Sequence, residues 1–156
     1  MRFLSYFIIC LIIISCKKTE KKLSNADKVN MENNTEITVK EDSKSFTLNN
    51  CKVQGENDLL DIKLNNGFDS DFELRISKIK NKFITEYTQL TSVTDSSYKK
   101  PVFNVINQSI ILNKTEYKKG DIIEGKLKID ISAHHTWEKD YVDTIKVTGS
   151  FKTILE

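Results

Sequence analysis

The chain has 156 residues, of which 38% are hydrophobic, 29% are charged, five are Gly and one is Pro. This length suits one ordinary domain and argues against two. The 24 basic and 22 acidic side chains leave a formal charge of +2, so the chain lacks the strong basic excess typical of nucleic-acid-binding proteins. The composition is too apolar for a wholly disordered chain and too polar for a protein that crosses a membrane several times.

The amino terminus has the pattern of a secretory signal peptide. Met1 and Arg2 place positive charge before an apolar run, residues 3–14, which only Ser5 interrupts. This run of about 12 residues is too short to cross a bilayer as a helix, which takes roughly 20 residues. A positive start, a short apolar core and a small residue at its end predict a leader that is removed from the mature protein.

The four residues Ile13-Ile14-Ser15-Cys16 resemble the lipobox of bacterial lipoproteins, in which an aliphatic, a variable and a small residue precede a Cys. The resemblance covers residues 1–16 and departs mildly from the family pattern, because Leu is usual at the position of Ile13. It implies cleavage after Ser15, attachment of fatty acids such as palmitate to the Cys16 thiol, and acylation of the new amino terminus. Two or more acyl chains hold a protein stably on a bilayer without spanning it. The alternatives are an uncleaved hydrophobic anchor and a plain secreted protein.

The segment after Cys16, KKTEKKLSNADKVNMENNT, is dominated by charge, Asn and Ser. Such a segment buries too little apolar surface to offset its ordering entropy, which predicts a flexible tether. Its Lys residues favour either contact with anionic lipid headgroups or solubility alone. We therefore predict a signal peptide (1–15), a lipidated Cys with a disordered tether (16–35) and one folded domain (36–156).

Cys51 is the one Cys expected in the folded domain, because Cys10 leaves with the leader and Cys16 carries lipid. No disulfide within the chain is then available, despite the exported setting. We interpret Cys51 as a small buried hydrophobe and not as a nucleophile, because a nucleophile needs a His partner and the sequence alone does not show one near it.

Apolar and polar residues alternate repeatedly through the domain. Period two puts alternate side chains on opposite faces of a strand, so each segment can bury one face and expose the other. Residues 82–93 favour neither strand nor helix, and the run Ile110-Ile111-Leu112 predicts a strand buried on both faces. Gly125 and Gly149 indicate bulges or close backbone approach. The alternation predicts strands at 37–39, 46–48, 58–64, 71–77, 126–131 and 144–151.

Residues that tolerate the left-handed conformations of tight turns separate these segments. Short strands at regular spacing, with turns between them, predict an all-β domain that is a single antiparallel β-sandwich or a small barrel. The expected turns are Asn49-Asn50, Asn65-Asn66-Gly67, Asp95-Ser96-Ser97 and Lys119-Gly120-Asp121.

The richest polar cluster is His134-His135-Thr136-Trp137-Glu138-Lys139-Asp140, which lies between two strand patterns and is predicted to be a hairpin loop. His134, His135 and Trp137 are the candidate ligand residues, with Trp137 as a stacking platform for a sugar. The alternative is a polar loop in which Trp137 covers the end of the core. Adjacent imidazoles on a strand point to opposite faces, so they chelate one metal only where the backbone turns. We expect neither a metal nor a cofactor.

The abundance of Lys, Ile and Asn, together with a lipoprotein signal and one β domain, looks like the small lipoproteins of Bacteroidota. The segments KKGDIIEGKLKIDI and IKVTGSFKTIL are similar to the closing strand pair of several uncharacterised families of that kind. In those bacteria Asp143-Thr144-Ile145 looks like an O-glycosylation acceptor. In lipoproteins resembling this one, Asp after the lipidated Cys often means retention in the inner membrane, so Lys17 favours the outer membrane.

The sequence contains no HExxH, GxSxG, CxxC or Gly-rich phosphate loop, which lowers the expectation of an enzyme. We therefore expect a non-enzymatic envelope lipoprotein with a binding or structural role, whose partners are the membrane and a protein or glycan but no nucleic acid. The alternatives are an immunity or inhibitor lipoprotein and a small barrel that carries an apolar ligand.

Overall fold

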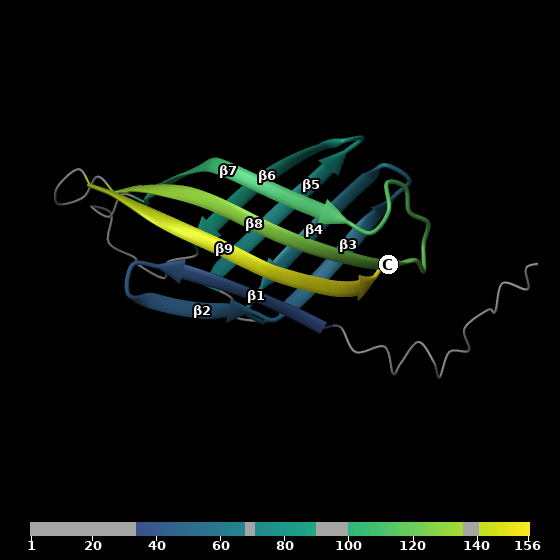
Figure 1. Cartoon of the computed structure of the whole chain (residues 1–156), viewed down its shortest axis with the longest axis horizontal. Helices are drawn as coiled ribbons and strands as arrows, with labels where there is room; N and C mark the ends of the chain where they lie inside the picture. The colour runs from purple at the N-terminus through teal and green to yellow at the C-terminus, as the bar shows by residue number, and fades with distance from the viewer. Residues whose placement is uncertain (1–33, 68–70, 90–99, 136–140) are drawn as a thin grey trace, which may run out of the picture. The chain divides into compact units, whose positions relative to one another are not determined.

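The computed structural model describes residues 34–67, 71–89, 100–135 and 141–156. Within these ranges the chain forms nine strands and no helix, so no helix there has the length and apolarity needed to cross a membrane. The strands make two antiparallel sheets that pack as a sandwich (Figure 1), which confirms the all-β prediction and selects the sandwich over the barrel. The strands are β1 (Asn34–Glu41), β2 (Lys44–Leu48), β3 (Asn50–Glu56), β4 (Leu59–Asn65), β5 (Phe72–Ile79), β6 (Lys82–Gln89), β7 (Val102–Leu112), β8 (Ile122–His135) and β9 (Tyr141–Ile154).

The chain changes sheets twice along its length. The first sheet has the order β2-β1-β9-β8-β7, and the second sheet has the order β3-β4-β5-β6. Asn49 alone separates β2 from β3, so the chain passes from the first sheet to the second at this residue. Figure 1 shows the first sheet in front of the second, with β2 and β7 as its two outer strands.

The core consists of the inward-facing apolar residues that the alternation predicted. In β4, Leu60, Ile62 and Leu64 are buried together, and they pair in register with inward positions of β5. In the first sheet, Val147 of β9 lies between Val39 and Ile129. Aromatic rings of β2, β5, β6 and β7 extend this core in a continuous series: Phe46, Phe72, Tyr87 and Phe103.

The prediction that Ile110, Ile111 and Leu112 are buried on both faces is wrong. They belong to β7, an edge strand, and the side chain of Ile111 is 65% exposed. An edge strand turns one face to the second sheet and the other to water, so a run of three apolar residues cannot be buried throughout. The ambiguous segment 82–93 forms β6 as far as Gln89.

Gly149 allows close approach of two strands, as predicted. It lies in β9 between Ile37 and Leu127 and adopts a φ of 150°. A Cβ atom at this position would overlap the carbonyl oxygen of Glu36. Gly125 has a related role, because its missing side chain leaves room for the ring of Phe151 on the neighbouring strand.

The sandwich has two ends, which we call the entry end and the far end. At the entry end Asn34, the first described residue, pairs with Lys152. The connection 113–121 closes this end through a backbone bridge between Asn57 and Tyr117 and through Lys78, whose Nζ donates to the carbonyl of Thr115 at 2.7 Å. The far end carries the β1–β2 turn, the last residue of β6, the last residues of β8 and the first residues of β9.

Candidate functional site

A pocket of about 320 Å³ opens at the far end of the sandwich, and we call it the far-end pocket. It is polar, and it combines side chains of five strands (β1, β2, β6, β8 and β9) and one turn. The strands contribute residues that are distant in the sequence, because β1 and β8 both pair with β9. The lining residues are Glu41, Asp42, Ser43, Lys44, Gln89, His135, Tyr141 and Asp143.

The pocket forms because the inward alternation of β8 and β9 continues beyond the core with polar residues. Ile131 and Ile145 are the last pair of large buried aliphatic residues in these strands. Beyond them Asp143 is opposite Ala133, and His135 is opposite Tyr141. The far end of the sandwich is therefore lined by the carboxylate of Asp143, the imidazole of His135 and the phenol of Tyr141.

His135 and Tyr141 form a stacked pair at the centre of the pocket. Their rings are 4.5 Å apart between centroids, with an interplanar angle of 11°. His135 is only 6% exposed, and its Nε2 lies 3.1 Å from Oδ2 of Asp143. Tyr141 is 44% exposed, so it offers an aromatic surface to solvent while its ring stacks on the buried His135.

Burial perturbs the pKa of Glu41, the acid that β1 contributes to the pocket. Partial burial raises the pKa of Glu41, and the negative charge of Asp143 adds to the increase, while Lys44 opposes it. Burial also raises the pKa of Tyr87, with a further contribution from Glu41. Within the described ranges the hydroxyl of Tyr87 has no hydrogen-bond partner. The pocket thus contains one partly desolvated carboxyl group, that of Glu41, whose hydrogen bonds to a ligand are stronger than in water.

Of the three predicted ligand residues, only His135 is placed in this pocket. His134 lies on the outer face of the first sheet, between Val102 and Val142, as expected for adjacent residues of one strand. The prediction that both His residues lie in a hairpin loop is wrong, because β8 continues through His135. Trp137 lies outside the described residues. In the described part of the chain, no group of three or more His, Cys, Asp or Glu side chains is arranged to hold a metal.

Sequence reasoning missed every lining residue of the pocket except His135, including Glu41, Gln89 and Tyr141. The signal for Glu41 was its position, two residues after Val39 in an alternating segment, so that it shares the inward face. Tyr141 and Gln89 had no comparable signal, because their inward position depends on where β9 begins and on how β6 pairs with β5.

Cys51 is a buried core residue, as predicted. Its side chain is 2% exposed, and burial raises the pKa of its thiol to about 12. A thiol with this pKa carries almost no thiolate at neutral pH, and the thiolate is the nucleophilic form. The chemistry available at Cys51 is therefore that of a small hydrophobe.

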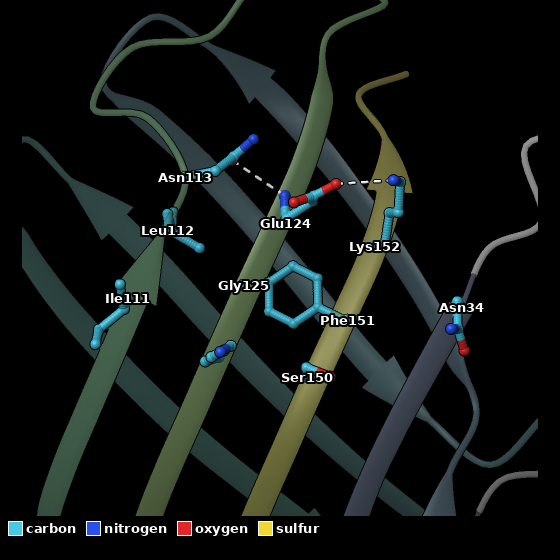
Figure 2. Close-up of a pocket in the computed structure, with 10 residues that line it drawn as sticks. Asn34, Ile111, Leu112, Asn113, Glu124, Gly125, Ser150, Phe151 and Lys152 are labelled. Atoms are coloured by element: carbon cyan, nitrogen blue, oxygen red, sulfur yellow. Dashed lines mark hydrogen bonds and ion pairs between the residues drawn. The ribbon is translucent and has the colours of Figure 1, made fainter.

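A second hollow, of about 570 Å³, lies at the entry end of the first sheet (Figure 2). Lys152 and Glu124 form an ion pair of 2.8 Å at its upper rim, and the backbone N–H of Glu124 donates to the side chain of Asn113. The ring of Phe151 lies at Gly125 in its centre. The ion pair neutralises Lys152 and Glu124 and leaves Lys126 as the remaining charged lining residue. The far-end pocket, with its exposed aromatic surface and grouped acceptors, is the stronger candidate site.

No protein-family model, curated protein or solved structure matches this chain.

Proposed function

We propose that the protein is an envelope lipoprotein, anchored through Cys16, whose sandwich is a non-enzymatic module that binds a glycan in the far-end pocket. The observation that carries this proposal is the parallel stack of Tyr141 on His135 beside two carboxylates. The lipobox resemblance at residues 13–16 supports the anchor and an outer-membrane location.

The pocket has the chemistry that a sugar requires. The C–H face of a pyranose is apolar and packs on an aromatic ring, and the open side of Tyr141 offers such a ring. Sugar hydroxyls donate to carboxylates, and the side chains of Glu41 and Asp143 supply these acceptors. Gln89 and Ser43 add groups that both donate and accept, which suits the mixed hydrogen bonding of a hydroxyl-rich ligand.

The position of the pocket supports the same proposal. The chain enters the sandwich at Asn34, at the end opposite to the pocket. The point at which the proposed tether joins the domain and the pocket therefore lie at opposite ends of the sandwich.

The anchor is tested by substituting Cys16→Ala in cells supplied with a clickable palmitate analogue. We expect the wild type to incorporate the label and the variant to lose it and to accumulate as an unprocessed precursor. Normal labelling of the variant would contradict the lipoprotein assignment.

The binding site is tested on an array of bacterial envelope and host polysaccharides with the wild type, Tyr141→Ala and Val142→Ala. Val142 is the matched control, because it is exposed and adjacent but lies on the opposite face of β9. A stacking contact of about 1 kcal/mol corresponds to roughly a fivefold loss of affinity, which we expect for Tyr141→Ala alone. Equal binding by all three proteins would refute the site, and tight binding to one protein without any glycan would favour the inhibitor alternative.

A further inference from the structure

The edge strand β7 differs from every other strand of the described sandwich. Its 11 residues, VFNVINQSIIL, include no Lys, Arg, Asp, Glu or Pro. Each of the other eight strands described contains at least one charged residue. Natural sheets usually protect an edge with charge, Pro or shortness, because an unpaired edge is a template for another strand.

The other three sheet edges have this protection. β2 has only five residues and carries Lys44. β3 carries Lys52 and Glu56, and β6 carries Lys82 and Glu86. β7 is longer than these edges and has one of the protective features, a bulge at Ile106.

The side chains of β7 expose apolar surface near both ends and near the middle of the strand. Val102 is 54% exposed, Ile106 is 63% exposed and Ile111 is 65% exposed. The bulge therefore does not hide Ile106. The core-facing residues are only partly buried: Phe103, Val105, Ile110 and Leu112.

The backbone of β7 is held in place on one side only. Among the described strands it pairs with β8 alone. Its contacts with β6 are made by side chains. The ring of Phe103 packs edge-on against Tyr87, and Gln108 donates from Nε2 to the carbonyl of Phe83 at 2.8 Å and accepts at Oε1 from the hydroxyl of Thr85 at 2.7 Å. These bonds hold the strand against the second sheet without pairing the outer edge of its backbone.

We propose that β7 pairs antiparallel with β7 of a second copy of this chain, so that two five-stranded sheets become one ten-stranded sheet. A second copy fits because an uncharged strand meets no like charge when it pairs with itself, whereas like charges directly opposite each other destabilise a sheet. Antiparallel pairing of identical strands is isologous, so it closes as a two-fold dimer and leaves no further uncharged edge. This inference goes beyond the glycan site and does not depend on it.

Cross-linking in the native membrane tests the pairing with the full chain. Asn107→Cys places a thiol near the middle of β7. The matched control is Glu86→Cys, which places a thiol at an exposed position of the edge strand β6. The native Cys51 is buried and its thiol is protonated, so the unsubstituted chain gives the background. With a short bis-maleimide we expect a homodimer from Asn107→Cys at least fivefold above the yields of the control and the unsubstituted chain.

Charge placed on the edge distinguishes pairing from chance contact. Adding Ile106→Lys and Ile111→Lys to the Asn107→Cys chain should lower the dimer yield to background, while adding Ile84→Lys should leave it unchanged. Far-UV circular dichroism of each purified chain must show the same β spectrum, so that a lost cross-link is not due to unfolding. Native mass spectrometry of the full chain in detergent is the second method, and it measures whether the mass is that of a monomer or a dimer. A monomer by both methods, a ladder of larger oligomers or a cross-link to a different protein would each overturn the proposal.

Discussion

Replacing Gly149 by Ala should be among the most damaging small substitutions in the protein. Gly149 has a φ of 150°, and an added Cβ would overlap the carbonyl of Glu36 and lie 2.8 Å from the Cα of Ile37. The unfavourable backbone conformation costs about 1–3 kcal/mol for any residue with a side chain. Crowding of β1 against β9 adds about 1–3 kcal/mol, as for an overpacked core. We expect a total loss of about 2–6 kcal/mol in the free energy of unfolding.

Gly67 separates these two contributions. Its φ is 128°, also in the region that favours glycine, but an added Cβ would meet no atom within 4 Å. Gly67→Ala should therefore cost only the conformational part, about 1–3 kcal/mol. Equilibrium unfolding in urea, followed by far-UV circular dichroism, measures both variants against the wild type. If Gly149→Ala were no more destabilised than Gly67→Ala, the close approach of β1 and β9 would be refuted.

Three further predictions concern buried groups. Burial makes the thiol of Cys51 unreactive. In a chain that begins at Lys17, a maleimide should therefore label Cys51 only after unfolding in urea. Fast labelling of the native protein would contradict the burial of Cys51. The raised pKa of Glu41 means that the folded state loses stability as pH rises from the ordinary value of 4.5 through the raised value. Between about pH 4 and about pH 7, the unfolding free energy of Glu41→Gln should therefore fall less than that of the wild type; parallel curves would count against a desolvated carboxylate. Lys78→Met should cost about 1–3 kcal/mol in urea unfolding because it removes the side-chain donor to the carbonyl of Thr115, while the carbonyl of Asp58 still accepts from the N–H of Lys80. Lys82→Met, at an exposed position, should cost less than about 0.5 kcal/mol.

Local alternation was sufficient to predict much of the sandwich. Leu60, Ile62 and Leu64 share a face because side chains of a strand alternate, whatever the strand pairs with. The same reasoning failed for Ile111, since its exposure depends on the position of β7 at the edge of the sheet. Position within a sheet is a property of long-range pairing, which no short stretch of sequence contains.

The candidate site was harder to predict for the same reason. Glu41 and Asp143 are about a hundred positions apart, and they share a pocket because β1 pairs with β9. His135 was recognised as a chemically versatile residue, but its partners Tyr141 and Asp143 follow from the register of the β8–β9 hairpin. The lipid anchor at Cys16 remains a prediction from the resemblance.

The most direct test of glycan binding in the far-end pocket is a titration of ¹⁵N-labelled protein with oligosaccharides of the cell envelope, followed by amide chemical shifts. We predict saturable shifts at residues 41–44, at His135 and at residues 141–143, with no shifts at Ile111 or Ser150 in the second hollow. Shifts confined to the second hollow, or no saturable shift with any envelope glycan, would contradict the proposed function.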